Sequence, residues 1–214
     1  MKQLLRLSLL MLSVCLLMGL TSCHPKNKKQ VTETENVVTQ QEFSSLLTPM
    51  AITDVEHTIA VDRQDMFGTH KAGNFQWFST GLVLSVNLDE ADAETIGVMS
   101  VTNEFHYLIG NGFDTEMLFY NHTSNGIVKT KPVSAYLTDR NPLGDIPIKL
   151  TFANAFVKAK QSNILLPHSR HVALVFPLND NNPIYVFGNR KDRIAVDAVT
   201  GEVYVYNGPL GEWP

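Results

Sequence analysis

The chain has 214 residues, two cysteines, 44% hydrophobic residues and a formal net charge of −4 at pH 7. This size and hydrophobic content suffice for one folded domain or two small packed modules. Lys and Arg are scattered apart from a short run at residues 26–29. The chain therefore lacks the basic surface of nucleic-acid-binding proteins, and we expect no nucleic-acid partner.

The first 23 residues have the pattern of a secretion signal. Lys2 and Arg6 supply positive charge, and residues 7–20 form an apolar run that is short for a membrane-spanning helix, which needs roughly 20 residues. The run ends at Leu20-Thr21-Ser22-Cys23, which resembles the lipobox of bacterial lipoproteins. This resemblance implies that residues 1–22 are a cleaved signal peptide and that Cys23 becomes an acylated (diacylglyceryl, palmitate-type) N-terminus held in a membrane.

Lipidation would leave a mature chain without free cysteine, because Cys15 leaves with the signal. No disulfide or cysteine-based metal site is then expected. Cleavage removes two positive charges and no acid, so the formal charge becomes −4 − 2 = −6. His24 stands where an aspartate would resemble an inner-membrane retention signal, which favours the outer membrane and leaves the periplasmic or surface side open. An uncleaved anchor helix is the alternative, and it would also attach the chain to a membrane.

Residues 23–37 are polar and predict a flexible tether. A capping-box pattern at Thr39 predicts a short helix over residues 39–47. Residues 50–66 are ambiguous. Alternating apolar positions favour a strand at Thr58–Asp62, whereas Thr53 and Glu56 also fit a helical capping box. Residues 66–74 contain two glycines and predict a loop.

From Phe75 onward the chain predicts a β-rich module, so that residues 38–131 form the N-terminal module. Alternation over residues 82–88 indicates a half-buried strand, and a second strand is expected at residues 96–103. Asn111-Gly112 and Asn125-Gly126 are typical of tight hairpin turns. These signals together predict an antiparallel meander.

Residues 132–150 are rich in turn residues and predict a connecting loop. A helix is expected over Thr151–Gln161, since its apolar residues recur at helical spacing. Strands are expected at residues 171–176, 184–187, 193–197 and 202–206, and residues 207–214, with Trp213, form a tail. The predicted fold class is α+β: an antiparallel sheet meander with one or two short helices, then a C-terminal helix followed by a three- to four-stranded antiparallel sheet.

The segment 151–206 resembles a PepSY-type module, a helix packed on a small antiparallel sheet. The resemblance rests on the helix, on Pro183-Ile184-Tyr185-Val186, and on Asp197-Ala198-Val199-Thr200-Gly201-Glu202-Val203, which is similar to the family's Asp-x-x-Thr-Gly-Glu-Val ending. It implies a non-enzymatic module that binds proteins or inhibits peptidases.

Three aromatic residues, Phe75, Trp77 and Phe78, are the candidate ligand-binding residues. If they are exposed, they can stack on a sugar or hold a peptide, whereas burial would make them part of the core. Burial is the favoured alternative.

The histidines are dispersed. His168 and His171 are three residues apart at a loop-to-strand junction and are interpreted as solvated, while His106 and His122 lie on opposite sides of one predicted hairpin. The acidic residues 89–94 lack the spaced ligands and the glycine of a calcium loop. No metal or cofactor is expected.

Motifs for nucleophilic catalysis and phosphate binding are also missing, so we predict no catalytic residues. The sequence favours a lipid-anchored envelope lipoprotein whose folded part binds a protein or peptide without enzymatic activity. A binder of glycans or small ligands through Phe75 and Trp77 is the alternative, and an envelope hydrolase is the third possibility.

Overall fold

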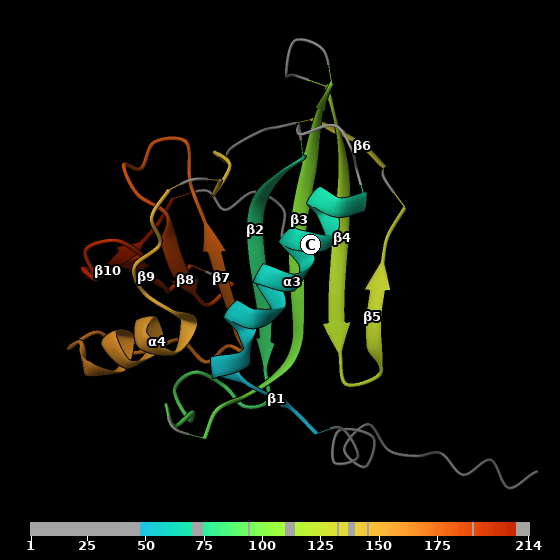
Figure 1. Ribbon diagram of the computed structural model, residues 1–214. Coiled ribbons are helices and arrows are strands. Elements are labelled where there is room, and N and C mark those ends of the chain that lie inside the picture. The colour runs from blue at the N-terminus through green and yellow to red at the C-terminus, as the bar shows by residue number, and fades with distance from the viewer. Residues whose placement is uncertain are drawn as a thin grey trace, which may run out of the picture. The chain divides into compact units, whose positions relative to one another are not determined.

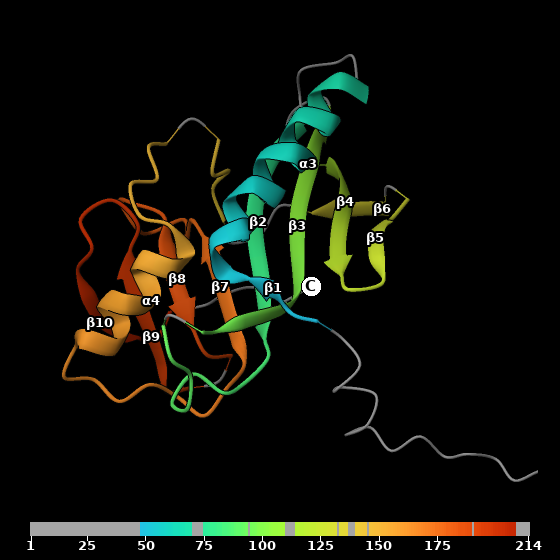
Figure 2. The ribbon, with the colours of Figure 1, turned by 60° about the horizontal axis from the view of Figure 1, so that its bottom comes forward.

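An antiparallel sheet with two helices on one face forms the folded part of the chain (Figures 1 and 2). The computed structural model describes residues 48–69, 75–93, 95–109, 114–131, 133–136, 140–144, 146–189 and 191–208. These residues all belong to one compact unit, residues 39–214. The α+β class with an antiparallel sheet is therefore confirmed.

Ten strands make up this sheet, in the order β10-β9-β8-β7-β2-β3-β4-β5, with β1 paired to β3 and β6 paired to β4. The strands are β1 (Met50–Ala51), β2 (Phe75–Leu84), β3 (Gly97–Ile109), β4 (Asp114–Thr123), β5 (Gly126–Lys129), β6 (Val133–Tyr136), β7 (His171–Val175), β8 (Ile184–Phe187), β9 (Arg193–Asp197) and β10 (Val203–Tyr206). The helices are a 3-10 turn (Ile52–Asp54), α3 (Val55–Thr69) and α4 (Phe152–Gln161).

The strand order is symmetrical about its centre. A helix followed by a meander occurs twice, as α3 with β2 to β5 and as α4 with β7 to β10. The first strands of the two meanders, β2 and β7, pair antiparallel from Ser79↔Val175 to Val83↔His171 and join the meanders into one sheet. The seam between the two α–β units therefore runs along β2 and β7.

Both helices pack on the same face of the sheet, on either side of this seam (Figure 2). Helix α4 presents Phe152, Ala155, Phe156 and Ala159 to the core, the positions predicted from its helical spacing. Thr151 caps this helix by accepting a hydrogen bond from the Asn154 amide at 3.1 Å. The helices and the sheet between them enclose the main hydrophobic core.

The predicted strand at Thr58–Asp62 is wrong, because these residues lie in helix α3. Val55, Ile59, Asp62 and Met66 are buried and recur at helical spacing. The third member of this stripe is an aspartate, which breaks the apolar pattern, and Val61 is exposed even though it fits the strand alternation.

The strands of the first half follow the predicted meander. The strand predicted at residues 96–103 continues to Ile109 as β3, and the one predicted at residues 82–88 begins at Phe75 and ends at Leu84 as β2. Residues 66–69, predicted as loop, continue α3. Gly126 has a φ of +117° at the turn between β4 and β5, as expected for an Asn-Gly hairpin. The predicted connecting loop, residues 132–150, contributes β6 to the sheet.

The turn between β9 and β10 has the contacts that its sequence predicts. The Asp197 carboxylate accepts hydrogen bonds from the amides of Val199 at 2.8 Å and Thr200 at 2.7 Å. Gly201 adopts a φ of +77°, which allows the chain to turn back into β10.

Several predictions fall outside the described residues: the signal peptide, Cys23, the tether, the short helix at 39–47, Asn111-Gly112 and the tail with Trp213. Among the helices that the structure describes, none is both long enough and apolar enough to span a membrane.

Candidate functional site: a pocket at the seam of the sheet

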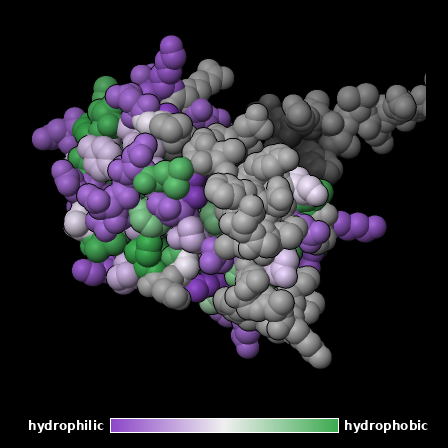
Figure 3. All heavy atoms as spheres, turned by 90° about the horizontal axis from the view of Figure 1, so that it is seen from above, coloured by the Kyte–Doolittle hydropathy of each residue, from purple (hydrophilic) through white to green (hydrophobic). Residues whose placement is uncertain are grey.

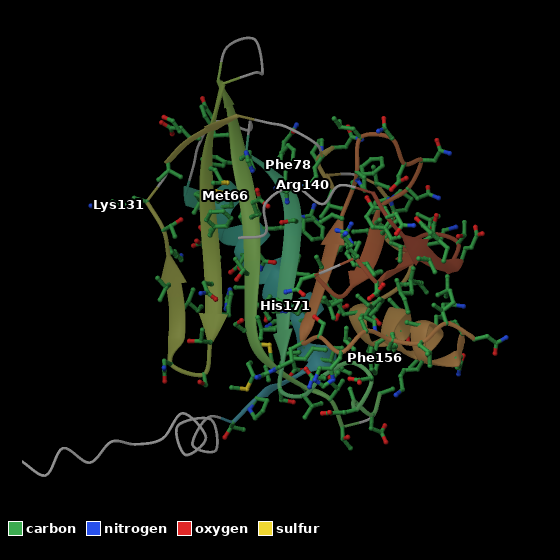
Figure 4. All side chains as sticks on the ribbon, turned by 180° about the vertical axis from the view of Figure 1, so that it is seen from behind. Met66, Phe78, Lys131, Arg140, Phe156 and His171 are labelled. Atoms are coloured by element: carbon green, nitrogen blue, oxygen red, sulfur yellow. The ribbon has the colours of Figure 1, made fainter. Side chains whose placement is uncertain are left out.

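The three predicted aromatic residues are all buried, in agreement with the favoured alternative. Phe75 and Trp77 join the core on the helix-covered face, and Phe75 contacts the Tyr107 ring. Phe78 lies on the opposite face, where its ring contacts His106 at 4.6 Å between centroids. Figure 4 shows the sheet from this side, with Phe78 labelled. The three residues therefore do not form one aromatic surface.

Trp77 lines a pocket at the seam. The pocket has a volume of about 240 Å³ and lies between α3, the segment that leads into α4, and strands β2, β7 and β8. Its lining residues are Glu56, Ile59, Ala60, Arg63, Trp77, Ile148, Lys149, Leu150, Thr151, Phe152, Leu174 and Tyr185. The buried residues among them are aromatic or aliphatic, and the exposed ones lie on α3 and on the segment 147–149. The pocket thus has an apolar floor and a partly polar rim.

Two cations and one acid belong to this rim. The Arg63 guanidinium lies over the Trp77 ring at 5.2 Å from its centroid. Neither Arg63 nor Lys149 forms an ion pair with any carboxylate that the structure describes. Glu56 instead accepts a hydrogen bond from the Phe152 amide at 2.6 Å, at the start of α4. Burial raises the pKa of Glu56, although this hydrogen bond acts in the opposite direction.

A chain of hydrogen bonds links the Trp77 indole to helix α3 through buried side chains of β2 and β3. The Trp77 indole N–H donates to Thr80 Oγ1 at 3.1 Å, and the Thr80 hydroxyl donates to Asn103 Oδ1 at 2.5 Å. The Asn103 amide donates to Asp62 Oδ2 at 2.6 Å, and His122 Nε2 lies 2.6 Å from the same oxygen. These polar groups are buried and mutually satisfied, so they fix the indole ring of Trp77 relative to helix α3.

A second polar cluster lies on the opposite face of the sheet around Glu104, whose exposed fraction is 1%. Arg140 donates to both of its carboxylate oxygens, at 2.7 and 3.1 Å. Ser79 Oγ donates to one oxygen at 2.5 Å, and His106 Nε2 lies 2.7 Å from the other. Burial raises the pKa of Glu104, but His106, Arg140 and Ser79 outweigh it and lower the pKa to about 2. Glu104 is therefore an ionised acceptor, and His106 is the donor of their bond.

This second cluster contains a serine, a histidine and a carboxylate, but not in the order of a catalytic triad. A triad requires the histidine between the serine and the acid, so that it can take the serine proton. Here Ser79 and His106 both bond to Glu104, which lies between them. Ser79 therefore bonds a carboxylate whose low pKa makes it a weak base, rather than a histidine. Glu104 instead holds Arg140, and the segment 140–143 lies against the end of β7.

The histidines are dispersed, as the sequence predicts, with His106 and His122 on the two paired strands β3 and β4. His106 and His122 do not meet, because they lie in the two separate clusters. His168 is exposed, as expected, but it contacts Asp89 at 3.1 Å and Asn87 at 3.2 Å across 79 and 81 residues of chain. His168, Asp89 and Glu90 form an exposed cluster whose ligand-type atoms all lie within 4.8 Å of one another.

Strand β5 forms one edge of the sheet, and all four of its residues are exposed, with Ile127 and Val128 among them. Lys129, the last residue of β5, bonds Asp65 on α3 at 2.6 Å, and Lys131 follows two residues after the end of the strand. Lysines at a sheet edge oppose pairing with another strand. Seen from above, exposed apolar residues form small separate groups among polar ones (Figure 3).

Sequence reasoning identified Trp77 but missed the rest of the pocket. Glu56 and Arg63 were assigned to an ambiguous segment, and Lys149 was assigned to a loop. A helical reading of residues 55–66 would have placed Glu56, Ile59 and Arg63 on one face. The contribution of residues 148–152 has no signal in the sequence, because it depends on how the two α–β units meet.

Comparison with known proteins adds no family to this description. The chain matches no protein-family model, no curated protein and no solved structure at a significant level. The function must therefore be argued from the pocket and its surroundings.

Proposed function

We propose that this chain is a lipid-anchored lipoprotein of the bacterial cell envelope whose folded part binds a protein or peptide partner without enzymatic activity. The observation that carries the proposal is the pocket at the seam, with its apolar floor and two rim cations, Arg63 and Lys149, that pair with none of the described carboxylates. A lipid at Cys23 would hold this pocket near a membrane, with the outer membrane favoured.

The size of the pocket favours a polypeptide partner. Pockets for drug-sized molecules occupy roughly 300–1,000 Å³. The volume of about 240 Å³ is smaller and suits a single side chain of a larger partner. A small free ligand is the alternative that the same volume allows.

Glycan binding has less support. Stacking on a sugar needs an open aromatic face. Only 6% of Trp77 is exposed, and Arg63 lies over its ring. An envelope hydrolase also has less support, because Ser79 bonds to Glu104, whose lowered pKa makes it a poor proton acceptor, rather than to a histidine.

We also propose a PepSY-like arrangement for residues 151–206. Helix α4 precedes four strands that pair in sequence, and the Asp197–Gly201 turn has the expected contacts. This arrangement supports a binding module, and the pocket lies beside it, at the start of α4.

Filling the pocket tests the proposal. Ala60 is exposed on α3 and lines the pocket, so Ala60→Trp should obstruct it without removing a core residue. The mature chain, made soluble by Cys23→Ser and immobilised, would be mixed with envelope extract, and the retained proteins would be quantified by mass spectrometry. We expect Ala60→Trp to reduce retention of the specific partner at least about tenfold, a loss of about 1.4 kcal/mol of binding free energy.

Val61→Trp is the matched control. Val61 is the next residue on the same helix, is exposed and does not line the pocket. Retention equal to that of the unmodified chain is expected. A partner that is retained equally by both tryptophan variants would contradict binding through the pocket.

The anchor has its own test. Cys23→Ser in the full-length chain should move the protein from the membrane fraction to the soluble fraction, because acylation at this sulfur is the proposed attachment. Immunoblots of fractionated cells measure this shift. Cys15→Ser, within the signal, should leave the distribution unchanged. Persistent membrane association of Cys23→Ser would indicate an uncleaved anchor helix instead.

A further inference from the structure

We propose that the pocket at the seam recognises the C-terminal residue of a polypeptide, with an apolar side chain on its floor and the terminal carboxylate on Arg63 and Lys149. This inference rests on the proposed binding function and specifies its partner.

The charged residues that line the pocket have a net positive charge. Arg63 and Lys149 contribute two positive charges to the lining, and Glu56 contributes one negative charge. The chain as a whole is acidic, with a formal charge of −4. The pocket is thus a locally cationic site on an acidic protein, which selects an anionic group in its ligand.

Glu56, the acid in the pocket lining, is bonded to the backbone rather than to the two cations. Its carboxylate faces the Phe152 amide at 2.6 Å and makes no ion pair with Arg63 or Lys149. Glu56 thus accepts the amide hydrogen bond at the start of α4, and among the described residues no carboxylate pairs with Arg63 or Lys149. A carboxylate of a bound ligand would form the ion pair that Arg63 and Lys149 lack among the described residues.

Arg63 is suited to this role by its position. Its guanidinium is held over the Trp77 ring, and that ring is fixed by the hydrogen bonds to Ser79 O at 3.0 Å and Thr80 Oγ1 at 3.1 Å. An arginine restrained in this way binds a carboxylate through two parallel hydrogen bonds with little loss of side-chain freedom. Lys149 comes from the opposite wall, where its amide bonds Ala198 O at 3.0 Å.

The apolar floor of the pocket indicates which kind of side chain the ligand carries beside its carboxylate. Ile59, Trp77, Phe152 and Leu174 are buried and apolar, and the Tyr185 hydroxyl is already committed to Leu150 O at 2.5 Å. The floor therefore offers contact to an apolar side chain, and the hydroxyl proton of Tyr185 is not available as a donor to the ligand. An apolar side chain and a carboxylate attached to the same carbon atom, Cα, are the two features of a C-terminal residue.

The test compares two forms of one peptide. Fluorescein-labelled hexapeptides ending in phenylalanine, leucine or methionine would be titrated with the mature Cys23→Ser chain, each as the free acid and as the C-terminal amide. Fluorescence polarisation measures the Kd. We expect the best free acid to bind at least about tenfold more tightly than its amide, since a hydrogen bond to a charged group accounts for such a ratio.

Arg63→Gln should reduce this ratio to near one, and Arg63→Lys should retain part of it. Lys191→Gln, which removes an exposed cation outside the pocket, should leave the ratio unchanged. Circular dichroism of each variant verifies that the fold is intact.

Other outcomes overturn the inference. Equal affinity for acid and amide would remove the C-terminal recognition but leave peptide binding in place. N-acetylphenylalanine binding as tightly as the hexapeptide would assign the pocket to a small carboxylic acid instead. If no peptide binds while a partner sensitive to Ala60→Trp is still retained from envelope extract, only this inference fails. If both assays fail, the proposed function fails as well.

Discussion

Replacing Glu104 by alanine should lower the free energy of unfolding by roughly 3–5 kcal/mol, the range for breaking a buried ion pair. The side chain is 1% exposed and accepts bonds from Arg140, Ser79 and His106. Its removal leaves a largely buried guanidinium and a hydroxyl without their acceptor. Urea denaturation of the mature Cys23→Ser chain, followed by circular dichroism, measures the change.

A double variant separates the two causes of this loss. Arg140→Met removes the guanidinium that Glu104→Ala leaves unpaired, so the double variant should be less destabilised than the sum of the two single changes. Glu202→Ala, at an exposed position in the β9–β10 turn, is the control and should change stability by no more than about 0.5 kcal/mol. A loss below about 1 kcal/mol for Glu104→Ala would contradict a tightly packed ion-pair cluster.

Glu104 also makes the stability of the fold depend on pH in the acid range. The pKa of Glu104 is lowered from 4.5 to about 2 in the folded chain, so its ionised form stabilises the fold at neutral pH. This contribution is complete above pH 4.5 and is lost as the pH falls towards 2. A shift of this size corresponds to about 3 kcal/mol. Glu104→Gln should flatten the stability curve over this acid range.

Replacing Asp62 by alanine has the second largest expected effect, a loss of roughly 3 kcal/mol of stability, the lower end of the range for removing one partner of a buried charged pair. Asp62 is 2% exposed and joins helix α3 to Asn103 on β3 and His122 on β4. Without the carboxylate, the Asn103 amide and the His122 ring lose their common acceptor in a buried site. Urea denaturation measures this loss.

Asp65 provides the matched control on the same helix. Its carboxylate bonds Lys129 at 2.6 Å and Tyr120 at 2.8 Å, but its side chain is 37% exposed. Solvent-exposed ion pairs contribute at most about 1 kcal/mol, so Asp65→Ala should be mild. Similar losses for both aspartates would contradict the role of burial. Asp62→Ala should also disturb the indole N–H resonance of Trp77, because the chain of hydrogen bonds joins the two residues.

Helix α3 shows why part of the fold could not be predicted from the sequence. Its buried stripe contains Asp62, and a charged residue at a core position reads as a break in the apolar pattern. Asn103 on β3 and His122 on β4 contact its carboxylate, and these hydrogen bonds offset the free-energy cost of burying it. The helix is therefore decided by contacts with residues far away in the sequence.

Local signals were sufficient where each one acts over a few residues. The apolar spacing from Phe152 to Ala159 predicts α4, and Asn125-Gly126 predicts the turn before β5. The burial of Phe75, Trp77 and Phe78 also follows from their apolar character. Their separation onto the two faces of the sheet follows from strand alternation, which puts Phe75 and Trp77 on one face and Phe78 on the other.

The sequence by itself determined the α+β class, the hairpins, helix α4 and, as a prediction, the lipid anchor at Cys23, because each depends on residues close together in the chain. The tertiary structure alone decided the antiparallel pairing of β2 with β7, which joins the two α–β units. It also decided the seam pocket and both buried polar clusters, where Arg63 meets Trp77 and Arg140 meets Glu104. These pairs are separated by many residues, and only the packing of the sheet brings their charges and rings into contact.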